Sequence, residues 1–232
     1  MSLLERYQSI LDQIKETCDR CGRDAAEITL IAVSKTFPVS CVQDLYALGH
    51  RDFGENKVQE MLDKRNYLEE LGGYDDIRWH LIGHLQRNKA RQVVGAFHLF
   101  HGLDSERLAK ELNSRAEANG HHVDCLVQVN ISGEDSKYGA SIERVDDLLA
   151  KIRAYKRIEV RGFMGMASVS PDPEVVKSEF KSLSEIAERQ SSTGDSLFLS
   201  MGMSQDYKLA IEEGASHIRI GSAIFGSRAY LK

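Results

Sequence analysis

Several features that would indicate a membrane or secreted protein are missing from this 232-residue chain. No stretch approaches the roughly 18 apolar residues that a membrane-spanning helix needs. Glu5 and Arg6 interrupt the N-terminal segment, so it has no apolar signal-peptide core. Proline occurs only three times, between expected elements or at the first residue of one, and no low-complexity linker divides the chain. We therefore expect a cytoplasmic protein, without a membrane partner, that forms one domain over residues 1–232.

Charge and cysteine content exclude further classes. The net charge of −5 has both signs spread along the chain, which gives no indication of a basic face for nucleic acid. Cys18 and Cys21 form a lone C-x-x-C, and a structural zinc site needs a second ligand pair at suitable spacing. Cys18 continues an apolar stripe of helical spacing within residues 2–21, so we expect it to be structural.

After this leading helix, short apolar segments alternate with helical segments. The expected strands are 29–33, 52–54, 77–82, 96–100, 123–131, 158–166, 197–199 and 217–220. The expected helices lie near 39–48, 56–71, 86–94, 105–119, 141–155, 173–190 and 204–213. Such alternation predicts a parallel sheet, and eight units predict an α/β fold of the (β/α)8 TIM-barrel type with an extra N-terminal helix. An open doubly wound sheet is the alternative, but no G-x-G-x-x-G follows the first strand.

Barrel proteins build their sites at the C-terminal ends of the strands. Lys35 follows the buried first strand almost directly. Burial favours a neutral amine, and a neutral amine attacks a carbonyl carbon to form a Schiff base. The alternative is a lysine whose ammonium group reaches solvent at the barrel rim.

The segments after the seventh and eighth strands have the composition of a phosphate site. The chain provides Ser200 and glycine before a helix start near Ser204, and Gly221-Ser222 before the last helical segment. Glycine lets the backbone approach a ligand, and N–H groups at helix starts favour an anion. Either segment alone is typical of turns and caps, but the two together, opposite a strand-end lysine, favour a phosphorylated aldehyde.

Arg219 is expected at the end of the eighth strand, beside the first strand of a closed barrel. Arginine only donates hydrogen bonds and stays charged. Facing a pyridine nitrogen, it would keep that nitrogen unprotonated and make the ring a poor electron sink. A salt bridge to an acidic residue is the alternative interpretation.

The motifs AVSKTFP, FGENKVQE, WHLIGHLQRNK, VQVNISGEDSKYG, GFMGMAS and LSMGMSQDYKLAIEEGASHIRIGSAIFG occur in this order between about residues 28 and 230. In this set the chain resembles the pyridoxal phosphate homeostasis proteins, also described as alanine-racemase N-terminal-domain-like. The resemblance implies a pyridoxal 5′-phosphate cofactor held by Lys35 as an internal aldimine. It implies a pyridine contact from Arg219 and a phosphate site at Ser200, Met201, Gly221 and Ser222. It also implies that Asn56 and His80 line the pocket.

The resemblance further implies a role in vitamin B6 and amino-acid homeostasis, and a monomer. Racemisation needs acid and base groups on both faces of the amino acid, and the nearest tyrosines by loop position, Tyr138 and Tyr207, have no evident catalytic placement. We therefore expect a carrier that delivers the cofactor to pyridoxal-phosphate-dependent apoenzymes, without turnover. The enzyme alternatives are a low-activity racemase and a Schiff-base aldolase.

Two other readings are less favoured. The basic stretch at residues 86–91 would suit RNA or protein binding, but it is typical of a solvated helix face. A metal site at His80 and His84 is disfavoured because His80 ends a strand, and the adjacent pair His121 and His122 lies in a turn.

Overall fold

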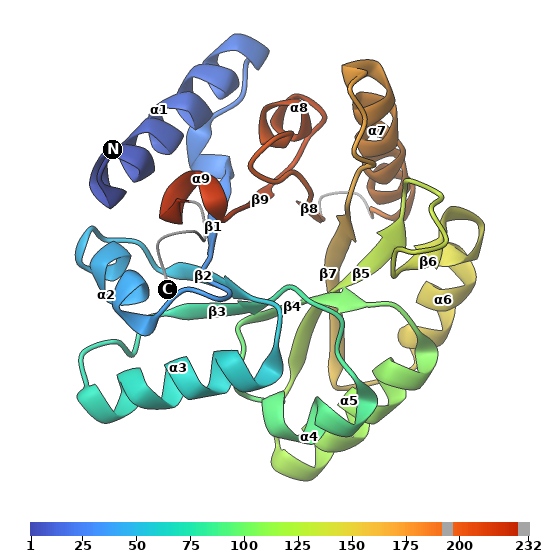
Figure 1. The fold of residues 1–232 in the computed structure, drawn as a ribbon. Coiled ribbons are helices and arrows are strands. Elements are labelled where there is room, and N and C mark those ends of the chain that lie inside the picture. Colours follow the sequence, from blue (N-terminus) through green and yellow to red (C-terminus); the bar gives the residue numbers. More distant parts are fainter. Residues whose placement is uncertain (192–196, 227–232) are drawn as a thin grey trace.

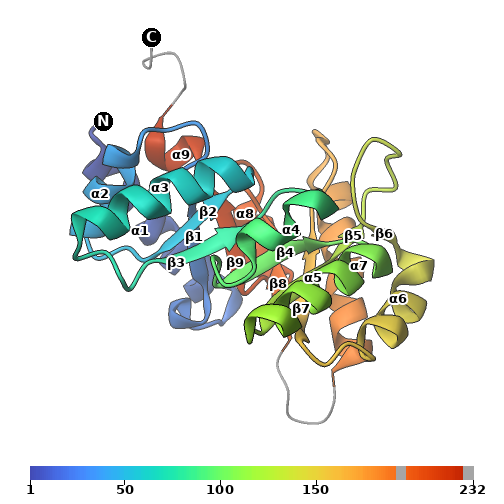
Figure 2. The same cartoon turned by 90° about the horizontal axis from the view of Figure 1, so that it is seen from below.

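A computed structural model describes residues 1–191 and 197–226, and within them eight parallel strands form a closed barrel surrounded by helices (Figures 1 and 2). The barrel strands are β1 Thr29–Val33, β2 Asp52–Glu55, β3 Arg78–Leu81, β4 Leu99–Leu103, β5 Val123–Asn130, β7 Ile158–Gly165, β8 Phe198–Ser200 and β9 His217–Ile220. They pair in the order β4-β3-β2-β1-β9-β8-β7-β5, and the pairing of β4 with β5 closes the barrel. The predicted (β/α)8 barrel is confirmed.

The helices follow the predicted alternation. They are α1 Leu3–Cys21, α2 Val39–Ala47, α3 Val58–Leu71, α4 Ala90–Val93, α5 Glu106–Asn119, α6 Val145–Ile152, α7 Pro173–Gln190, α8 Tyr207–Glu212 and α9 Ser222–Phe225. Ser2 and Glu5 form a capping box on α1, and Gly22 ends the helix in the left-handed conformation. Cys18 is buried on α1, as its place in the apolar stripe predicted. Among the described residues, no helix has the length and apolar character needed to cross a membrane.

Two separate groups of buried side chains stabilise the barrel. The larger apolar core lies between the outer face of the strands and the helices, and it includes Ala32, Phe53 and Ile218. A second, small apolar cluster joins Leu99, Leu126 and Met164, and Met166 packs against it. Alternate residues of a strand face opposite sides, so the strand residues that point away from the outer core fill the barrel interior.

Most predicted boundaries differ from the structure by one to three residues, and three segments differ in a way that has a structural reason or adds an element. Strand β4 begins three residues later than expected, because Gly95 at φ 85° and the Ala96 N–H to Val93 carbonyl bond continue the turn after α4. The predicted helix at 86–94 is a 3-10 turn, Arg87–Lys89, followed by the short α4. The segment at 141–155 begins with the short strand β6 (Ala140–Ser141), which the sequence pattern did not predict and which pairs with β5.

Candidate cofactor-binding site

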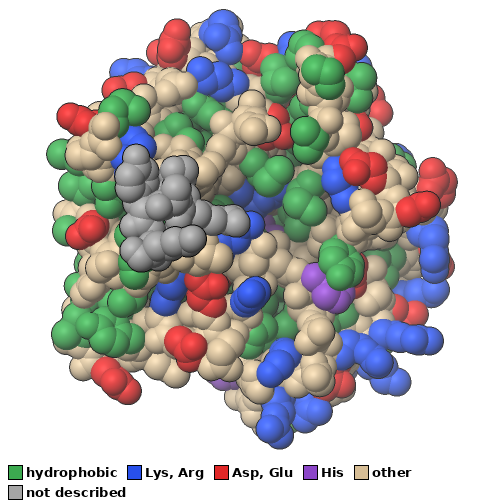
Figure 3. All heavy atoms as spheres, in the orientation of Figure 1, with side chains coloured by type: hydrophobic (Ala, Val, Ile, Leu, Met, Phe, Trp, Pro, Cys, Tyr) green, Lys and Arg blue, Asp and Glu red, His purple; other side chains and the backbone are tan. Residues whose placement is uncertain are grey.

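A cavity of about 550 Å³ lies at the C-terminal ends of the strands. We call it the strand-end cavity. Its lining includes five of the residues predicted from the sequence, namely Lys35, Asn56, Arg219, Gly221 and Ser222. Figure 3 looks onto this end of the barrel, where Lys and Arg side chains lie around the centre of the face. The fold thus gathers residues from the ends of β1, β2 and β9 around one space.

Lys35 is positioned by a buried contact on its N-terminal side. Ser34 Oγ donates a hydrogen bond to Glu55 Oε1 at 2.7 Å. Lys64 Nζ donates to the Ser34 carbonyl at 2.8 Å and to Glu55 Oε1 at 2.6 Å. Because Glu55 is fully buried and Lys64 nearly so, this ion pair fixes the backbone at the end of β1.

The C-terminal side of Lys35 is fixed by the same cluster. Thr36 has φ 68°, a left-handed conformation that is rare for a β-branched residue. Its N–H donates to Glu60 Oε1 at 2.5 Å, and Glu60 also accepts from Lys64 Nζ at 2.9 Å. We call the residues that hold both flanks the Lys35 clamp: Ser34, Thr36, Glu55, Glu60 and Lys64.

Arg219 is a buried cation, with 5% of its surface exposed. Its Nη1 donates to Ser200 Oγ at 2.6 Å and its Nη2 donates to the Gly165 carbonyl at 3.1 Å. Burial lowers the pKa of the Arg219 guanidinium to about 10, so it keeps its charge at neutral pH. No carboxylate of the described chain forms an ion pair with it, so the salt-bridge interpretation raised by the sequence is wrong for the residues described.

The loops after β8 and β9 meet at the cavity wall. Ser222 Oγ donates to Ser204 Oγ at 3.4 Å, and both residues line the strand-end cavity. Gly202 has φ 88°, and a Cβ there would lie 2.6 Å from Ala210 Cβ, so only glycine fits this turn. The Met203 N–H donates to Asp206 Oδ1 at 2.5 Å, which closes the loop. Burial raises the pKa of the Asp206 carboxyl.

The other three predicted site residues lie away from this lining. Ser200 is fully buried and accepts a hydrogen bond from Arg219. The Met201 N–H already donates to the His217 carbonyl at 3.1 Å. His80 is buried in the barrel interior, where it contacts Asp52 and His101. Sequence position alone identified these residues as close to strand ends, but it did not show that their polar groups already have protein partners.

Sequence reasoning also missed residues that support the site. The i, i+4 spacing of Glu60 and Lys64 was a signal for a salt bridge on α3. His101 was left one residue beyond the expected strand 96–100, although it lies two residues after the interior Leu99 and so shares its side of β4.

The family described as "Alanine racemase, N-terminal domain" matches residues 10–229 of the chain. The chain belongs to this family. It is 38% identical over 232 residues to a pyridoxal phosphate homeostasis protein of Aquifex aeolicus, covering 99% of this chain and 100% of that one. The protein of the same name from Escherichia coli K12 is 40% identical over 231 residues, covering 96% and 95%.

A solved structure of the family is also similar. PipY of Synechococcus elongatus, determined with pyridoxal phosphate bound, has a TM-score of 0.82 and 32% sequence identity. The match covers 97% of this chain and 100% of that chain. These similarities confirm the resemblance to the pyridoxal phosphate homeostasis proteins seen in the sequence motifs, and they extend it to the fold.

Proposed function

We propose that the protein binds pyridoxal 5′-phosphate in the strand-end cavity, through a Schiff base with Lys35 Nζ. The observation that carries this proposal is that Lys35, Arg219 and Ser222 line one cavity. An amine, a guanidinium and a hydroxyl match the aldehyde, ring nitrogen and phosphate of this cofactor. The names of the similar proteins and the ligand of PipY support the same assignment.

The phosphate would be held by the two loops that meet at the wall. Ser204 and Ser222 supply hydroxyl donors, and Gly221 lets the backbone approach the ligand. Ser200 and Met201 would act from below these loops, since Ser200 contacts Arg219 and Met201 joins β8 to β9. Asn56 completes the wall at the end of β2.

The site is better suited to holding the cofactor than to turnover. A charged, donor-only Arg219 at the pyridine nitrogen would keep it unprotonated and weaken the ring as an electron sink. Neither Tyr138 nor Tyr207 is among the residues that line the strand-end cavity. Tyr138 stacks on His84 with ring centroids 4.1 Å apart, and the Tyr207 hydroxyl donates to Gln13 Oε1 at 3.2 Å.

We therefore propose a cytoplasmic carrier and regulator of pyridoxal phosphate that passes the cofactor to dependent apoenzymes. Delivery requires access from solvent, and the cavity lining includes Val169, which is 94% exposed, and the half-exposed Met203. The proposed carrier works as a monomer over residues 1–232. The curated relatives carry homeostasis names that agree with this role.

The deciding experiment is visible absorption of the purified protein after addition of pyridoxal phosphate, with and without borohydride. We expect a band that borohydride removes, and a reduced pyridoxyl group on the peptide that contains Lys35. The Lys35→Ala variant should lack both. Lys57→Ala is the matched control, because Lys57 is an exposed lysine at the end of the neighbouring strand and lines a different cavity.

Two results would count against the proposal. A native-like band in Lys35→Ala would place the cofactor elsewhere. Interconversion of amino-acid enantiomers by the loaded protein, lost in Lys35→Ala, would replace the carrier with the racemase alternative.

A further inference from the structure

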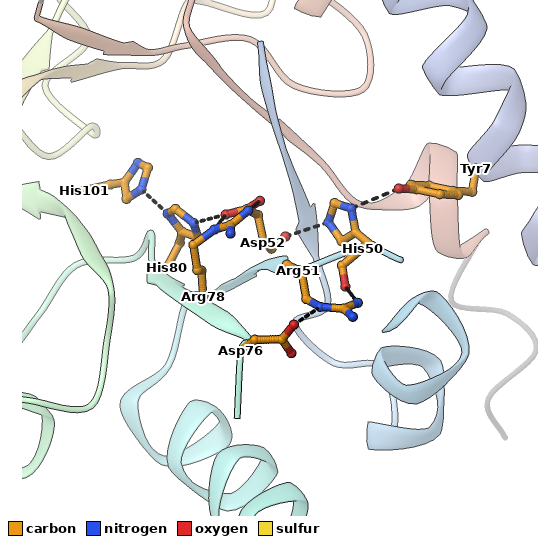
Figure 4. A network of polar contacts seen from close by, with 8 residues as sticks. All are labelled: Tyr7, His50, Arg51, Asp52, Asp76, Arg78, His80 and His101. Carbon is orange, nitrogen blue, oxygen red and sulfur yellow. Dashed lines mark hydrogen bonds and ion pairs between the residues drawn. The ribbon is translucent and has the colours of Figure 1, made fainter. Parts of the chain in front are cut away.

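A continuous line of polar side chains crosses the barrel interior from one end to the other. Arg219 Nη1 contacts Ser200 Oγ at 2.6 Å, and Ser200 Oγ contacts His101 Nδ1 at 2.9 Å. His101 Nε2 lies 3.0 Å from His80 Nδ1, and His80 Nε2 lies 3.1 Å from Asp52 Oδ1. Each of these five residues is at most 8% exposed. We call them the interior chain, and Figure 4 shows its part from His101 through His80 to Asp52.

The two ends of the interior chain fix the direction of every hydrogen bond in it. Arginine can only donate, so Ser200 Oγ accepts from Arg219. The ionised Asp52 at the other end can only accept, so with both rings neutral His101 Nδ1 is left as an acceptor and Ser200 Oγ donates its proton to it. His101 must then carry its proton on Nε2 and donate it to His80 Nδ1. His80 in turn carries its proton on Nε2 and donates it to the Asp52 carboxylate.

Burial keeps this arrangement in one protonation state. Desolvation lowers the pKa of His101 well below its usual value and also lowers that of His80. Burial alone would raise the pKa of Asp52, but hydrogen bonds from His80 and Arg78 hold it well below its usual range. Arg78 forms a two-point contact, with Nε 2.7 Å from Asp52 Oδ1 and Nη2 2.5 Å from Asp52 Oδ2.

The far end of the chain opens onto a different space. Asp52, Arg78 and His80 line a cavity of about 270 Å³ whose other lining residues include the first residues of β1, β4, β8 and β9. This cavity therefore lies at the N-terminal ends of the strands, opposite the strand-end cavity. The interior chain therefore connects Arg219, which lines the strand-end cavity, to the Asp52 carboxylate at the other end of the barrel.

We propose that Asp52, His80 and His101 are positioning residues of the cofactor site, acting on Arg219 through Ser200. They orient the Ser200 hydroxyl so that its lone pair faces the guanidinium, and the Asp52 charge polarises each bond along the chain. This inference rests on the proposed function for its consequence in cofactor binding. The polarity of the chain itself is a property of the protein without ligand.

The first test reads the histidine protons directly. Nitrogen-15 NMR of the labelled full-length protein, before and after addition of pyridoxal phosphate, reports which ring nitrogen is protonated. We expect His101 and His80 to be neutral with the proton on Nε2 in both states. A charged ring, or a proton on Nδ1 of either residue, would overturn the proposed chain.

The second test measures the dissociation constant of pyridoxal phosphate by absorption. His101→Phe removes the acceptor of the Ser200 proton, so we expect the constant to rise about fivefold, the effect of one ordinary hydrogen bond. His101→Asn returns an acceptor oxygen near the position of Nδ1 and should stay within about twofold of the native value. His217→Phe is the matched control, because His217 is a buried interior histidine whose ring lies near His101 but outside the chain.

The outcomes separate the two proposals. Equal weakening by His101→Phe and His217→Phe, or failure of His101→Asn to restore binding, would show general packing damage and overturn the positioning role. A native protein that takes up no pyridoxal phosphate would overturn the proposed function, while the NMR result would still decide the polarity of the interior chain. If His101→Phe does not fold, His101→Asn and the NMR measurement decide the question.

Discussion

At the scale of single residues, the backbone around Lys35 is held in a costly conformation. A left-handed β-branched residue such as Thr36 costs of the order of 1–3 kcal/mol, which its surroundings must offset. Two sets of hydrogen bonds offset this cost. The Thr36 N–H donates to Glu60, and Lys64 donates to the Ser34 carbonyl and to Glu55. A lysine that must meet a ligand at a fixed position gains from such a rigid support.

We expect Lys64→Met to destabilise the protein by about 3–5 kcal/mol, because it leaves the Glu55 carboxylate buried without its partner. In the part of the chain described, Glu55 Oε2 lacks a hydrogen-bond partner, so after loss of Lys64 the carboxylate would keep only the neutral Ser34 hydroxyl as a donor. Urea unfolding measures the change. The control Lys57→Met removes the same charge from an exposed position and should change the free energy of unfolding by less than about 0.5 kcal/mol.

A double variant sharpens this prediction. Adding Glu55→Gln to Lys64→Met removes the unpaired charge and should recover part of the lost stability. A loss below about 1 kcal/mol in Lys64→Met would contradict the clamp, because that is the range of an exposed ion pair.

The residues of the site were partly predictable from the sequence. Lys35, Arg219 and Gly221 were expected to lie near one another because strand ends converge at one edge of a parallel barrel, and they line the same cavity. His80 was expected to line the pocket, but it lies in the barrel interior beside His101 and Asp52. The position of a residue along a strand does not show how deep in the barrel its side chain lies. The Lys35 clamp was missed because Glu55 and Lys64 come from different elements, and their contact depends on how α3 packs on the barrel.

At the scale of elements, α1 contacts α9, the helix that follows the proposed phosphate loop, instead of forming an appendage. Arg6 Nε donates to the Ile224 carbonyl at 2.7 Å and its Nη2 to the Phe225 carbonyl at 3.2 Å. These carbonyls belong to α9, which begins at Ser222 on the cavity wall. Figures 1 and 2 both show α1 beside α9.

We expect Arg6→Met to raise the dissociation constant of pyridoxal phosphate by about three- to tenfold, because two carbonyls of α9 lose their donors. Absorption titration measures this change. Lys15→Met is the control, since Lys15 is an exposed cation on the same helix. Equal affinities of the two variants, with a lower melting temperature for Arg6→Met alone, would show that α1 stabilises the fold without supporting the site.

Element order was predictable because hydrophobic runs and helical stripes alternate along the chain, whereas some ends were not. Strand β4 was placed too early because Ala96 and Phe97 are apolar and the polar His101 and Gly102 look like a loop. His101 is tolerated in a strand because the interior chain satisfies both of its ring nitrogens. The pattern of single residues could not reveal partners on β3 and β8.

At the scale of the whole molecule, closure of the barrel places many polar groups out of water. Eight repeating units predicted closure, but an open sheet remained an alternative until the pairing of β4 with β5 was seen. Four histidines are buried in or against the barrel: His50, His80, His101 and His217. Desolvation is the largest cause that lowers the pKa of each, and the pKa of His217 falls to about 3.

These pKa shifts predict a loss of stability in mild acid. A histidine whose pKa is lower in the folded state than its unfolded value of about 6.5 binds fewer protons when folded, so stability falls as the pH drops below that value. Each such group contributes a slope of up to about 1.4 kcal/mol per pH unit. For His217 the window runs from about pH 6.5 down to about 3. The lowered pKa of Asp52 acts in a different window, because its contribution is kept above about pH 4 and lost only below it.

Urea unfolding at a series of pH values between 7 and 5 tests this expectation, in a range where Asp52 stays ionised. We expect the free energy of unfolding to decrease steadily, and we expect His217→Gln to reduce the slope by up to about 1.4 kcal/mol per pH unit because that ring no longer titrates on unfolding. A flat profile in the native protein would mean that the interior histidines gain protons without unfolding, and that the barrel interior is more open to water than its packing indicates.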